Sequence, residues 1–387
     1  MIRKDWPNFS KSLVSKVGKI IKSGTINYTI GPYGKIFENQ FSKFIGTKYS
    51  VAVCNGTAAL EVGIKSLKLP KKSKILVPAR SFFSSASCIV NTGHIPIFLD
   101  VDKQTQNISV NEIEKKMTKD TRAIICVHLA GLPCDMYKIK KIAKKKNLKI
   151  IEDCSQAHGA SINKKYVGSF GDLSTWSFCN DKIISTLGEG GMISTNNKKI
   201  YEFCKSHINH GTSTQNTKQS YGFNYNKDYF GTNLRITEIQ SLAGSEQLKN
   251  LKKIQKKREK MAKDYFNLIS QYKEYFESYY PEKQIKSAWY RFYFFLKTNI
   301  KNSQKIRIRI IKNLRINGLK SFTGSCPEIY LEKSFKKFKN FKQKRLNNCK
   351  SLGEKSIALD LNHTLSYSVH KKNIIIFEKV IKNIVAR

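Results

Sequence analysis

The stretch GDLSTWSFCNDKIISTLGEGGMIST (171–195) places one lysine, Lys182, between two segments with the character of β-strands. Leu173 to Phe178 alternates small polar with large apolar residues, and Met192 to Ser194 reads as a returning strand. The turn between them is rich in glycine: Gly188, Gly190 and Gly191. A lysine partly shielded from water at a strand end loses some preference for the charged form and can act as a nucleophile. The alternative is an ordinary surface lysine.

Upstream of this stretch, short apolar segments alternate with helical patterns. The expected strands lie at Tyr49 to Cys54, Lys74 to Pro78, Pro96 to Asp100, Arg122 to His128 and Leu148 to Glu152. Apolar residues recur at helical spacing from Ile36 to Ile45, and Met136 to Lys146 forms a further helical pattern. Such strand–helix units favour an α/β domain in which helices cover both faces of a mostly parallel sheet. Ligands of these sheets bind beyond the carboxyl ends of the strands.

Three polar segments fall at such strand ends. They are Asn55-Gly56-Thr57, Arg80-Ser81-Phe82-Phe83 and Asp153-Cys154-Ser155-Gln156. The first precedes a helix that starts at Ala58, so its free backbone N–H groups and the positive end of the helix dipole can hold a phosphate group. An ordinary helix N-cap would use the same residues, and the sequence leaves both interpretations open.

Asp153 places a carboxylate at the rim of the expected crevice. Alone, it could equally cap a following helix. Together with the phosphate seat and Lys182, it fits pyridoxal 5'-phosphate, which needs a lysine for its Schiff base, a carboxylate on its pyridine nitrogen and donors around its phosphate. The carboxylate keeps that nitrogen protonated, and the protonated ring withdraws electrons from the carbanion formed at the substrate carbon.

The chain of 387 residues is long enough for one large domain and a smaller one. It contains no uncharged apolar run of about 18 residues, and MIRKDWPNFSKSL (1–13) lacks the apolar core of a signal peptide. The 9 cysteines form no close pairs at metal-ligand spacing, and several lie in apolar runs, as reduced core thiols do. These features predict a soluble cytoplasmic protein with no membrane span and no metal site.

The formal net charge of +42 raises the question of nucleic acid, because a basic surface attracts phosphate backbones of any sequence. Most of the basic residues are lysines spread widely along the chain. No zinc-finger spacing, RNP-like aromatic motif or recognition helix accompanies them. A lysine-rich surface explains the pattern at least as well as a dedicated site, so no specific nucleic-acid partner is expected.

Six motifs, in this order, resemble the DegT/DnrJ family of pyridoxal-phosphate-dependent sugar aminotransferases. They are NGTAALEVGIKSL (55–67), PARSFFSSASCIVNTGHIPIFLDVD (78–102), VHLAGLPCDM (127–136), IEDCSQAHGA (151–160), VGSFGDLSTWSFCNDKIISTLGEGGMIST (167–195) and GTNLRITEIQSLAGSEQL (231–248). Each motif alone is only suggestive, whereas the ordered set is specific and spans nearly the whole chain. The resemblance implies the fold type I aminotransferase architecture, with a three-layer, mostly parallel-sheet large domain that binds pyridoxal phosphate and a smaller α+β C-terminal domain.

The resemblance also implies a role for individual residues. Lys182 would form the Schiff base and shuttle a proton, and Asp153 would pair with the pyridine nitrogen. Gln156 would lie near the phenolic oxygen of the cofactor, and Phe82 would stack on its ring. The phosphate contacts would come from Gly56, Thr57, Ala58, Ser177 and, from the neighbouring subunit, Asn233. His158 occupies a family-typical position, but it could as well be a core histidine and is left out of the catalytic set.

Two segments depart from the common pattern of the family. The lysine turn carries Leu187 as an extra residue before GEGG. In addition, GSCPEIYLEKSF (324–335) stands where many relatives have a histidine-containing motif near the substrate. The second departure leaves the sugar unidentified.

The chain changes character after Asn250. A lysine-rich helix at Leu251 to Tyr272 leads to an apolar strand at Trp289 to Leu296 and then to further basic sequence. We therefore expect a large domain at residues 1–250 and a small C-terminal domain at residues 251–387. The N-terminal segment, although it belongs to the large domain in this division, could pack on the small domain.

By this resemblance, the protein is a homodimeric aminotransferase with an active site built by both subunits. It would move an amino group from an amino acid, L-glutamate by analogy with the family, to a keto group of a nucleotide-linked sugar, for amino-sugar and cell-surface polysaccharide biosynthesis. Sugar dehydratases of the same fold have a histidine in place of the Schiff-base lysine, so Lys182 argues against that alternative. The alternative from another class is a basic regulatory or nucleic-acid-associated protein without turnover.

Overall fold

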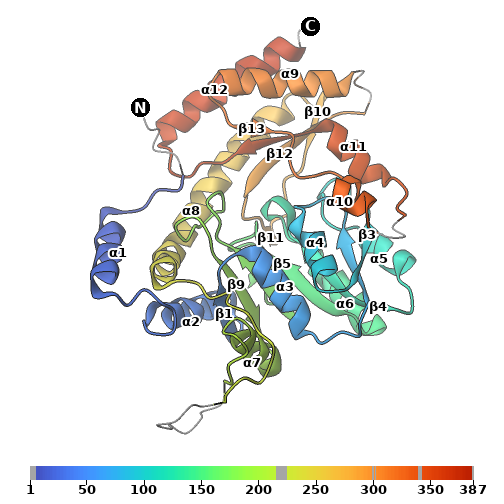
Figure 1. The fold of residues 1–387 in the computed structure, drawn as a ribbon. Helices are drawn as coiled ribbons and strands as arrows, with labels where there is room; N and C mark the ends of the chain where they lie inside the picture. Colours follow the sequence, from blue (N-terminus) through green and yellow to red (C-terminus); the bar gives the residue numbers. More distant parts are fainter. Residues whose placement is uncertain (1–5, 215–224, 299, 301, 339–341, 386–387) are drawn as a thin grey trace.

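The computed structural model describes residues 6–214, 225–298, 300, 302–338 and 342–385. Its centre is a 7-stranded sheet in the order β1-β9-β8-β5-β4-β2-β3 (Figure 1). The strands are β1 (Tyr49–Val53), β2 (Lys74–Pro78), β3 (Ile95–Leu99), β4 (Thr121–Val127), β5 (Lys149–Asp153), β8 (Leu173–Ser177) and β9 (Gly191–Thr195). β9 is antiparallel to both of its neighbours, and the other pairs from β8 to β3 are parallel. The expectation of a mostly parallel sheet is confirmed.

Alternate residues of the strands pack against two different layers of helices, as the period of a strand requires. Val51 and Val53 contact the layer of α3 (Gly56–Ser66), α4 (Ser84–Asn91) and α7 (Lys198–His207), whereas Ala52 between them faces the opposite layer. The opposite layer contains α2 (Tyr33–Ile45), α5 (Val110–Lys116), α6 (Met136–Lys146) and the first half of α8 (Glu238–Ser270). The three-layer arrangement expected from the sequence is therefore present.

A second, antiparallel sheet of 4 strands forms the small domain, in the order β10-β12-β14-β13. Its strands are β10 (Phe276–Ser278), β12 (Arg291–Leu296), β13 (Ser321–Phe322) and β14 (Ser356–Asp360). The helices of this region are α9 (Ser303–Ile316), α10 (Lys333–Lys336), α11 (Asn347–Lys355) and α12 (Tyr367–Val385). A third sheet contains β6 (Ser161–Ile162), β7 (Lys165–Tyr166) and β11 (Ile285–Lys286), and α1 (Lys11–Ser23) lies beside α8.

The helix α8 runs from the large domain into the small one (Figure 1). Thr237 caps it, because the Thr237 hydroxyl accepts from the Gln240 amide while the Gln240 side chain accepts from the Thr237 N–H. The helix thus begins earlier than Leu251, and the expected domain boundary at residue 250 falls inside it.

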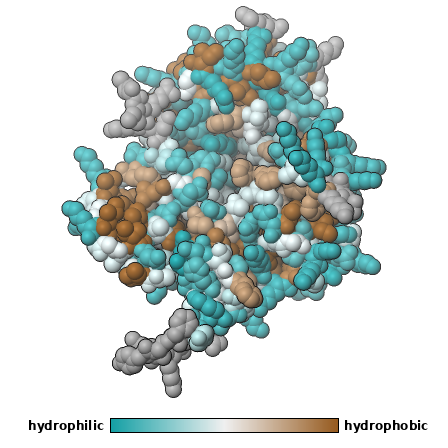
Figure 2. All heavy atoms as spheres, in the orientation of Figure 1, coloured by the Kyte–Doolittle hydropathy of each residue, from teal (hydrophilic) through white to brown (hydrophobic). Residues whose placement is uncertain are grey.

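The face of the molecule in Figure 2 is largely hydrophilic, as expected for a lysine-rich chain. Apolar side chains gather on this face over α1, where Val14 and Ile21 are exposed. Among the described residues, no helix combines the length and the apolar character that crossing a bilayer requires.

The packing of α2 against α8 predicts a strong effect of Gly244→Ala. A Cβ at Gly244 would lie 2.5 Å from the ring of Phe37, which is fully buried and contacts Phe41 and Phe178. We expect a loss of about 1–3 kcal/mol in the free energy of unfolding, measured by urea denaturation. The control is Gly18→Ala in α1, where a Cβ meets nothing within 4 Å; it should be neutral or stabilising. Equal stability of the two variants would contradict this account of the interface.

Candidate active site

The three polar segments expected at strand ends meet in one cavity of about 850 Å³ at the carboxyl edge of the large sheet. The small domain closes the other side through residues that include Tyr290, Arg291 and Phe322. The predicted site residues that line the cavity are Gly56, Thr57, Ala58, Phe82, Asp153, Gln156, Ser177 and Lys182. Of the residues predicted, Asn233 alone lies outside its wall.

The start of α3 forms one end of this cavity. A Cβ at Gly56 would lie 2.7 Å from the Cβ of Ser177 and 3.2 Å from its hydroxyl oxygen, so glycine is needed for this close approach. The approach brings the Ser177 hydroxyl beside the first amides of the helix, which lack intrahelical partners. The Ala58 amide, expected to face a phosphate, instead donates to Oδ1 of the N-cap Asn55 at 2.8 Å. The same turn therefore contains an N-cap and, beside it, groups that could bind a phosphate.

Asp153 ends β5 and is buried, with 4% of its surface exposed. Its Oδ2 accepts from the Ser85 hydroxyl at 2.8 Å, and Ser85 lies 2.9 Å from the hydroxyl of Ser81. Its Oδ1 accepts from the Ser155 amide at 3.2 Å. No helix starts at this point of the described chain, so the helix-cap interpretation of Asp153 is wrong. The carboxylate is instead held in place at the cavity wall.

The neighbouring Glu152 points to the other side of β5 and is completely buried. It accepts from the amides of Gly168, Phe170 and Gly171 at 2.7–2.8 Å, and from Nε2 of His128 at 3.1 Å. Burial would raise the pKa of Glu152, but the bonds from His128 and these amides outweigh it and hold the pKa below its ordinary value of 4.5. The hydrogen bonds of this carboxylate connect the end of β4, β5 and the turn that leads into β8.

Together with Cys154, His128 and Glu152 form the one candidate metal cluster among the described residues. The Cys134 amide donates to Nδ1 of His128 at 3.0 Å, so the neutral ring carries its proton on Nε2 and donates it to Glu152. Burial raises the pKa of the Cys154 thiol well above its ordinary value. The ring thus offers no free lone pair and the thiol no thiolate, so the cluster is structural.

Lys182 follows β8 and is largely buried, with 17% of its side chain exposed. Its Nζ lies 3.3 Å from Oδ1 of Asp181 and 5.1 Å from the centre of the Tyr290 ring. Tyr290 donates to the other oxygen of Asp181, and the indole N–H of Trp6 donates to the Lys182 carbonyl at 2.7 Å. Burial alone would lower the pKa of Lys182, but Tyr290 and Asp181 raise it above its ordinary value. The expectation that Lys182 loses some of its preference for the charged form is therefore wrong.

Gln156 and Phe82 also line the cavity. The Gln156 Oε1 accepts from the Ala130 amide at 2.8 Å, which directs its Nε2 to other acceptors. Phe82 lines the cavity while 67% of its surface remains exposed. An exposed aromatic ring at the mouth of a cavity can stack on a planar ligand.

Asn233 and His158 lie elsewhere. Asn233 is exposed and pairs through its backbone with Asn209, and Thr237, not Asn233, caps α8. His158 is buried between Trp176 and Phe178, and neither of its ring nitrogens has a hydrogen-bond partner. Burial, with a smaller contribution from Lys182, lowers the pKa of His158 to about 3. The side chain is a neutral core histidine.

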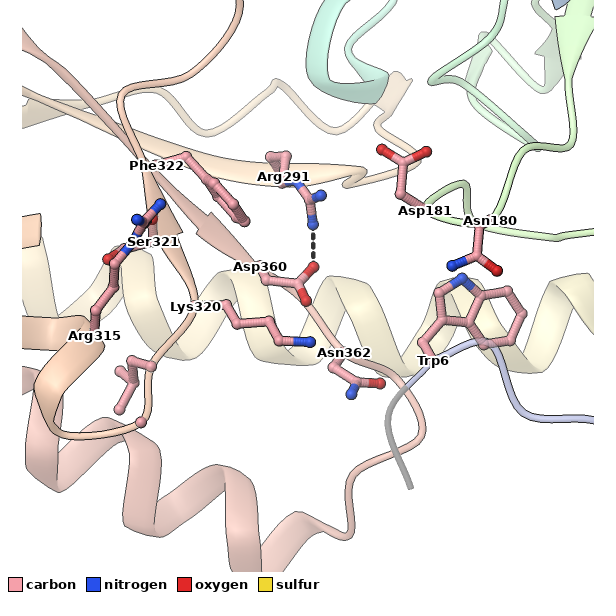
Figure 3. Close-up of a pocket in the computed structure, with 12 residues that line it drawn as sticks. Trp6, Asn180, Asp181, Arg291, Arg315, Lys320, Ser321, Phe322, Asp360 and Asn362 are labelled. Carbon is pink, nitrogen blue, oxygen red and sulfur yellow. Dashed lines mark hydrogen bonds and ion pairs between the residues drawn. The ribbon is translucent and has the colours of Figure 1, made fainter. Parts of the chain in front are cut away.

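Sequence reasoning missed several residues around Lys182. A second cavity of about 590 Å³ adjoins the first, and the two share Asp181, Arg291 and Phe322. Figure 3 shows its wall, with Arg291 directed at Asp360 and with Trp6 and Asn180 at the opposite end from Arg315. Asp181 could have been found from the sequence, because it directly precedes Lys182. Arg291 and Trp6 gave no local signal, because the chain folds back over a long distance to bring them here.

The donors of the first cavity fit pyridoxal phosphate. A primary amine, a buried carboxylate, an amide and a helix N-terminus with a serine hydroxyl are the groups that its aldehyde, ring nitrogen, phenolic oxygen and phosphate require. The tight contact of Gly56 with Ser177 brings the two phosphate-binding groups together.

Residues 7–374 match the DegT/DnrJ/EryC1/StrS aminotransferase family. The chain is 41% identical to the GDP-perosamine synthase of Escherichia coli O157:H7 over 218 residues, which cover 56% of this chain and 58% of that protein, less than two thirds of its length. It is 35% identical to the dTDP-3-amino-3,6-dideoxy-alpha-D-galactopyranose transaminase of Aneurinibacillus thermoaerophilus, over 67% of this chain and 69% of that one. The X-ray structure of the aminotransferase from Psychrobacter cryohalolentis has a TM-score of 0.94 and 35% identity, over 98% of each chain.

The bonds of Glu152 predict a pH-dependent effect of Glu152→Gln. The amide would turn an N–H toward backbone donors, so we expect a loss of about 3 kcal/mol in the free energy of unfolding at neutral pH. Because the pKa of Glu152 is lowered on folding, its contribution is present above 4.5 and is lost as the pH falls through the folded value. The difference between wild type and variant should therefore shrink below pH 4.5, measured by urea unfolding at several pH values. The exposed Glu114→Gln is the control, and a difference that stays constant with pH would contradict the assignment.

Proposed function

The chain belongs to the DegT/DnrJ/EryC1/StrS aminotransferase family, and from this premise we propose that it transfers an amino group to a keto group of a nucleotide-linked sugar. The proposed cofactor is pyridoxal 5'-phosphate, and the proposed donor is L-glutamate. The names of the relatives support the sugar, since one is a GDP-perosamine synthase and another a dTDP-amino-sugar transaminase. The proposed setting is amino-sugar and cell-surface polysaccharide biosynthesis in the cytoplasm.

One observation carries this proposal. Lys182, the buried Asp153 and the N-terminus of α3 face one cavity from three different strand ends. Each residue alone has an ordinary structural explanation. Together in one cavity, they match the aldehyde, the ring nitrogen and the phosphate of a single cofactor.

The residues of the chain would divide the work as follows. Bound pyridoxal phosphate supplies the aldehyde carbon and the electron-withdrawing ring. Asp153, held by Ser85, would keep the ring nitrogen protonated, and Lys182 would hold the aldehyde end of the cofactor and serve as the proton carrier at the substrate carbon. Asp181 and Tyr290 hold Nζ on the side of the small domain. Because Tyr290 and Asp181 raise the pKa of Lys182 against the effect of burial, the amine must give up a proton before it can react as a nucleophile.

Two other functions are less well supported. A dehydratase of the same fold would lack the lysine at this position, and Lys182 lies in the cavity. A basic regulatory or nucleic-acid-associated protein would have no use for a buried carboxylate and a lysine in a shared cavity. The net charge of +42 also suits anionic nucleotide substrates.

We place Asn233 in the active site of a second subunit of a homodimer. Its side chain is exposed, lies outside the cavity of its own chain and does not cap α8. Nearby, Phe230 is fully exposed and Tyr229 is 41% exposed, as expected for apolar groups that a second chain covers. The sequence from Gly211 to Asp228 is rich in Thr, Asn, Gln and Tyr and resembles a loop that crosses the dimer interface in the family; it lies partly outside the described residues.

Lys182→Ala should retain its fold yet lose transamination by several orders of magnitude, because one substitution removes both the nucleophile and the proton carrier. The assay is 2-oxoglutarate release from L-glutamate with a panel of nucleotide-linked ketosugars. Borohydride should abolish the visible absorption band of the wild-type protein. Lys199→Ala, an exposed lysine of α7, is the control and should be fully active. Near-normal turnover by Lys182→Ala would sink the assignment of the lysine.

Subunit mixing tests whether Asn233 serves the partner. Lys182→Ala and Asn233→Asp chains, each inactive or weakened as homodimers, are combined and allowed to exchange. If the site is shared, one site of each heterodimer has an intact lysine and an intact asparagine, so activity should recover toward half per exchanged dimer. If Asn233 serves its own chain, every site keeps one defect, and no recovery on mixing would refute the shared site.

A further inference from the structure

The backbone of Lys182 is held by a residue from a distant part of the chain. Lys182 lies in the loop between β8 and β9, outside the ladder that pairs these two strands. Its N–H donates to the carbonyl of Cys179 at 3.1 Å, within the loop itself. Its carbonyl accepts from the indole N–H of Trp6 at 2.7 Å, a residue 176 positions earlier in the chain. Figure 3 shows the Trp6 ring beside Asn180 of the same loop.

A second ring fixes Trp6. The centres of the Trp6 and His363 rings are 4.4 Å apart, with an angle of 57° between their planes. His363 is buried, and its Nδ1 accepts from the guanidinium of Arg258 at 2.9 Å. Burial, with smaller contributions from Arg258 and Lys257, lowers the pKa of His363 to about 3. The ring is therefore neutral at physiological pH and keeps an acceptor for Arg258.

Arg258 of α8 supports both sides of the lysine. Its guanidinium is buried and donates from Nε to the carbonyl of Trp289 at 2.9 Å and from Nη2 to the carbonyl of Tyr290 at 2.8 Å. The Tyr290 ring in turn lies 5.1 Å from Nζ of Lys182. The rigid fork of one arginine thus fixes the ring beside Nζ and, through His363, the indole that binds the backbone of the lysine.

The backbone contact has a different role from the contacts of the amine. In the proposed function, Nζ of Lys182 holds the aldehyde end of the cofactor and later serves as a proton carrier, so its contacts with Asp181 and Tyr290 cannot be constant. The bond from Trp6 to the carbonyl does not involve Nζ and can persist throughout. A displacement of about 1 Å at a reacting group can slow a reaction by about a hundredfold, so the place of the Lys182 backbone matters.

We propose that Trp6 is a positioning residue for Lys182. Its indole N–H fixes the backbone of the lysine, while His363 and Arg258 fix the indole. The proposal rests on the proposed function and deepens it, since it says how the chain places the amine that the reaction needs. Trp6 acts on the reaction only through the lysine.

The test replaces Trp6 by phenylalanine, which keeps a ring for His363 but removes the N–H. Pyridoxal phosphate is added to the whole chain freed of cofactor, and the rate at which the visible absorption band appears measures how well Lys182 is placed. We expect Trp6→Phe to lower this rate about fivefold, the size of effect that loss of one hydrogen bond produces. The kcat of the holoenzyme should fall by a similar factor, with an unchanged KM for the ketosugar.

Two further variants separate positioning from stability. Ser10→Ala is the control: it removes the N-cap of α1, where the Ser10 hydroxyl accepts from the Leu13 amide at 3.1 Å. It should destabilise this segment and leave both rates unchanged. His363→Asn keeps an acceptor for Arg258 but removes the ring, so it should resemble Trp6→Phe. The double variant should lose less than the product of the two single losses, because both changes act through one bond.

Three results would overturn the proposal: unchanged rates in Trp6→Phe, an equal loss of rate in Ser10→Ala, and losses in the double variant that simply multiply. The outcome is separable from that of the proposed function. A wild type that forms the visible band but aminates no ketosugar refutes the function, while the rate of band formation still tests Trp6. An active wild type with an equally active Trp6→Phe variant keeps the function and refutes the role of Trp6. A wild type that forms no band refutes both.

Discussion

The buried carboxylate of Glu152 is the constraint on which the active-site edge of the sheet depends. A charge in a fully apolar interior is tolerated only when it is completely hydrogen-bonded, and this one has bonds from His128 and from the amides of Gly168, Phe170 and Gly171. Those partners come from the end of β4 and from the turn before β8. By satisfying one charge, the chain fixes the strand that carries Asp153 relative to the strand that leads to Lys182. The two strands that carry the cavity residues are thus held in place by the hydrogen bonds of Glu152.

The sequence was informative where a function depends on neighbours along the chain. The expected β2 and α6 agree with the structure, and β1, β5 and β8 differ only at their ends, because apolar runs flanked by turns set these elements locally. The convergence of residues 55–57, 80–83 and 153–156 followed from the geometry of parallel strands. The roles carried by the resemblance to the family remain predictions, although all of those residues except Asn233 line the cavity.

The predictions that differ from the structure do so for a common physical reason. The pKa of Lys182 depends on Asp181 and on Tyr290, and Tyr290 reaches the lysine only through the fold of the small domain. The sequence left the N-cap and the phosphate seat open at residues 55–57, and only the rotamer of Asn55 in the folded chain shows that the Ala58 amide is engaged. The change of character expected at Asn250 falls inside α8, whose first turns are packed against α2 and contain small residues such as Gly244 rather than a clear apolar stripe. Side-chain electrostatics and packing across domains are properties of the folded chain.

The single helix α8 has a consequence for how the protein folds and comes apart. Leu248, Leu251 and Ile254 in its middle turns belong to an apolar cluster of the large domain, and its last turns, from Met261 to Ile269, belong to that of the small domain. The main cluster of the large domain also takes in Tyr293 and Ile329 from beyond the helix. A fragment ending near residue 250 would expose parts of these apolar clusters to water, so we expect that the two regions are not independent folding units. Unfolding should spread cooperatively through α8, and damage to either region will be felt as a loss of stability in both.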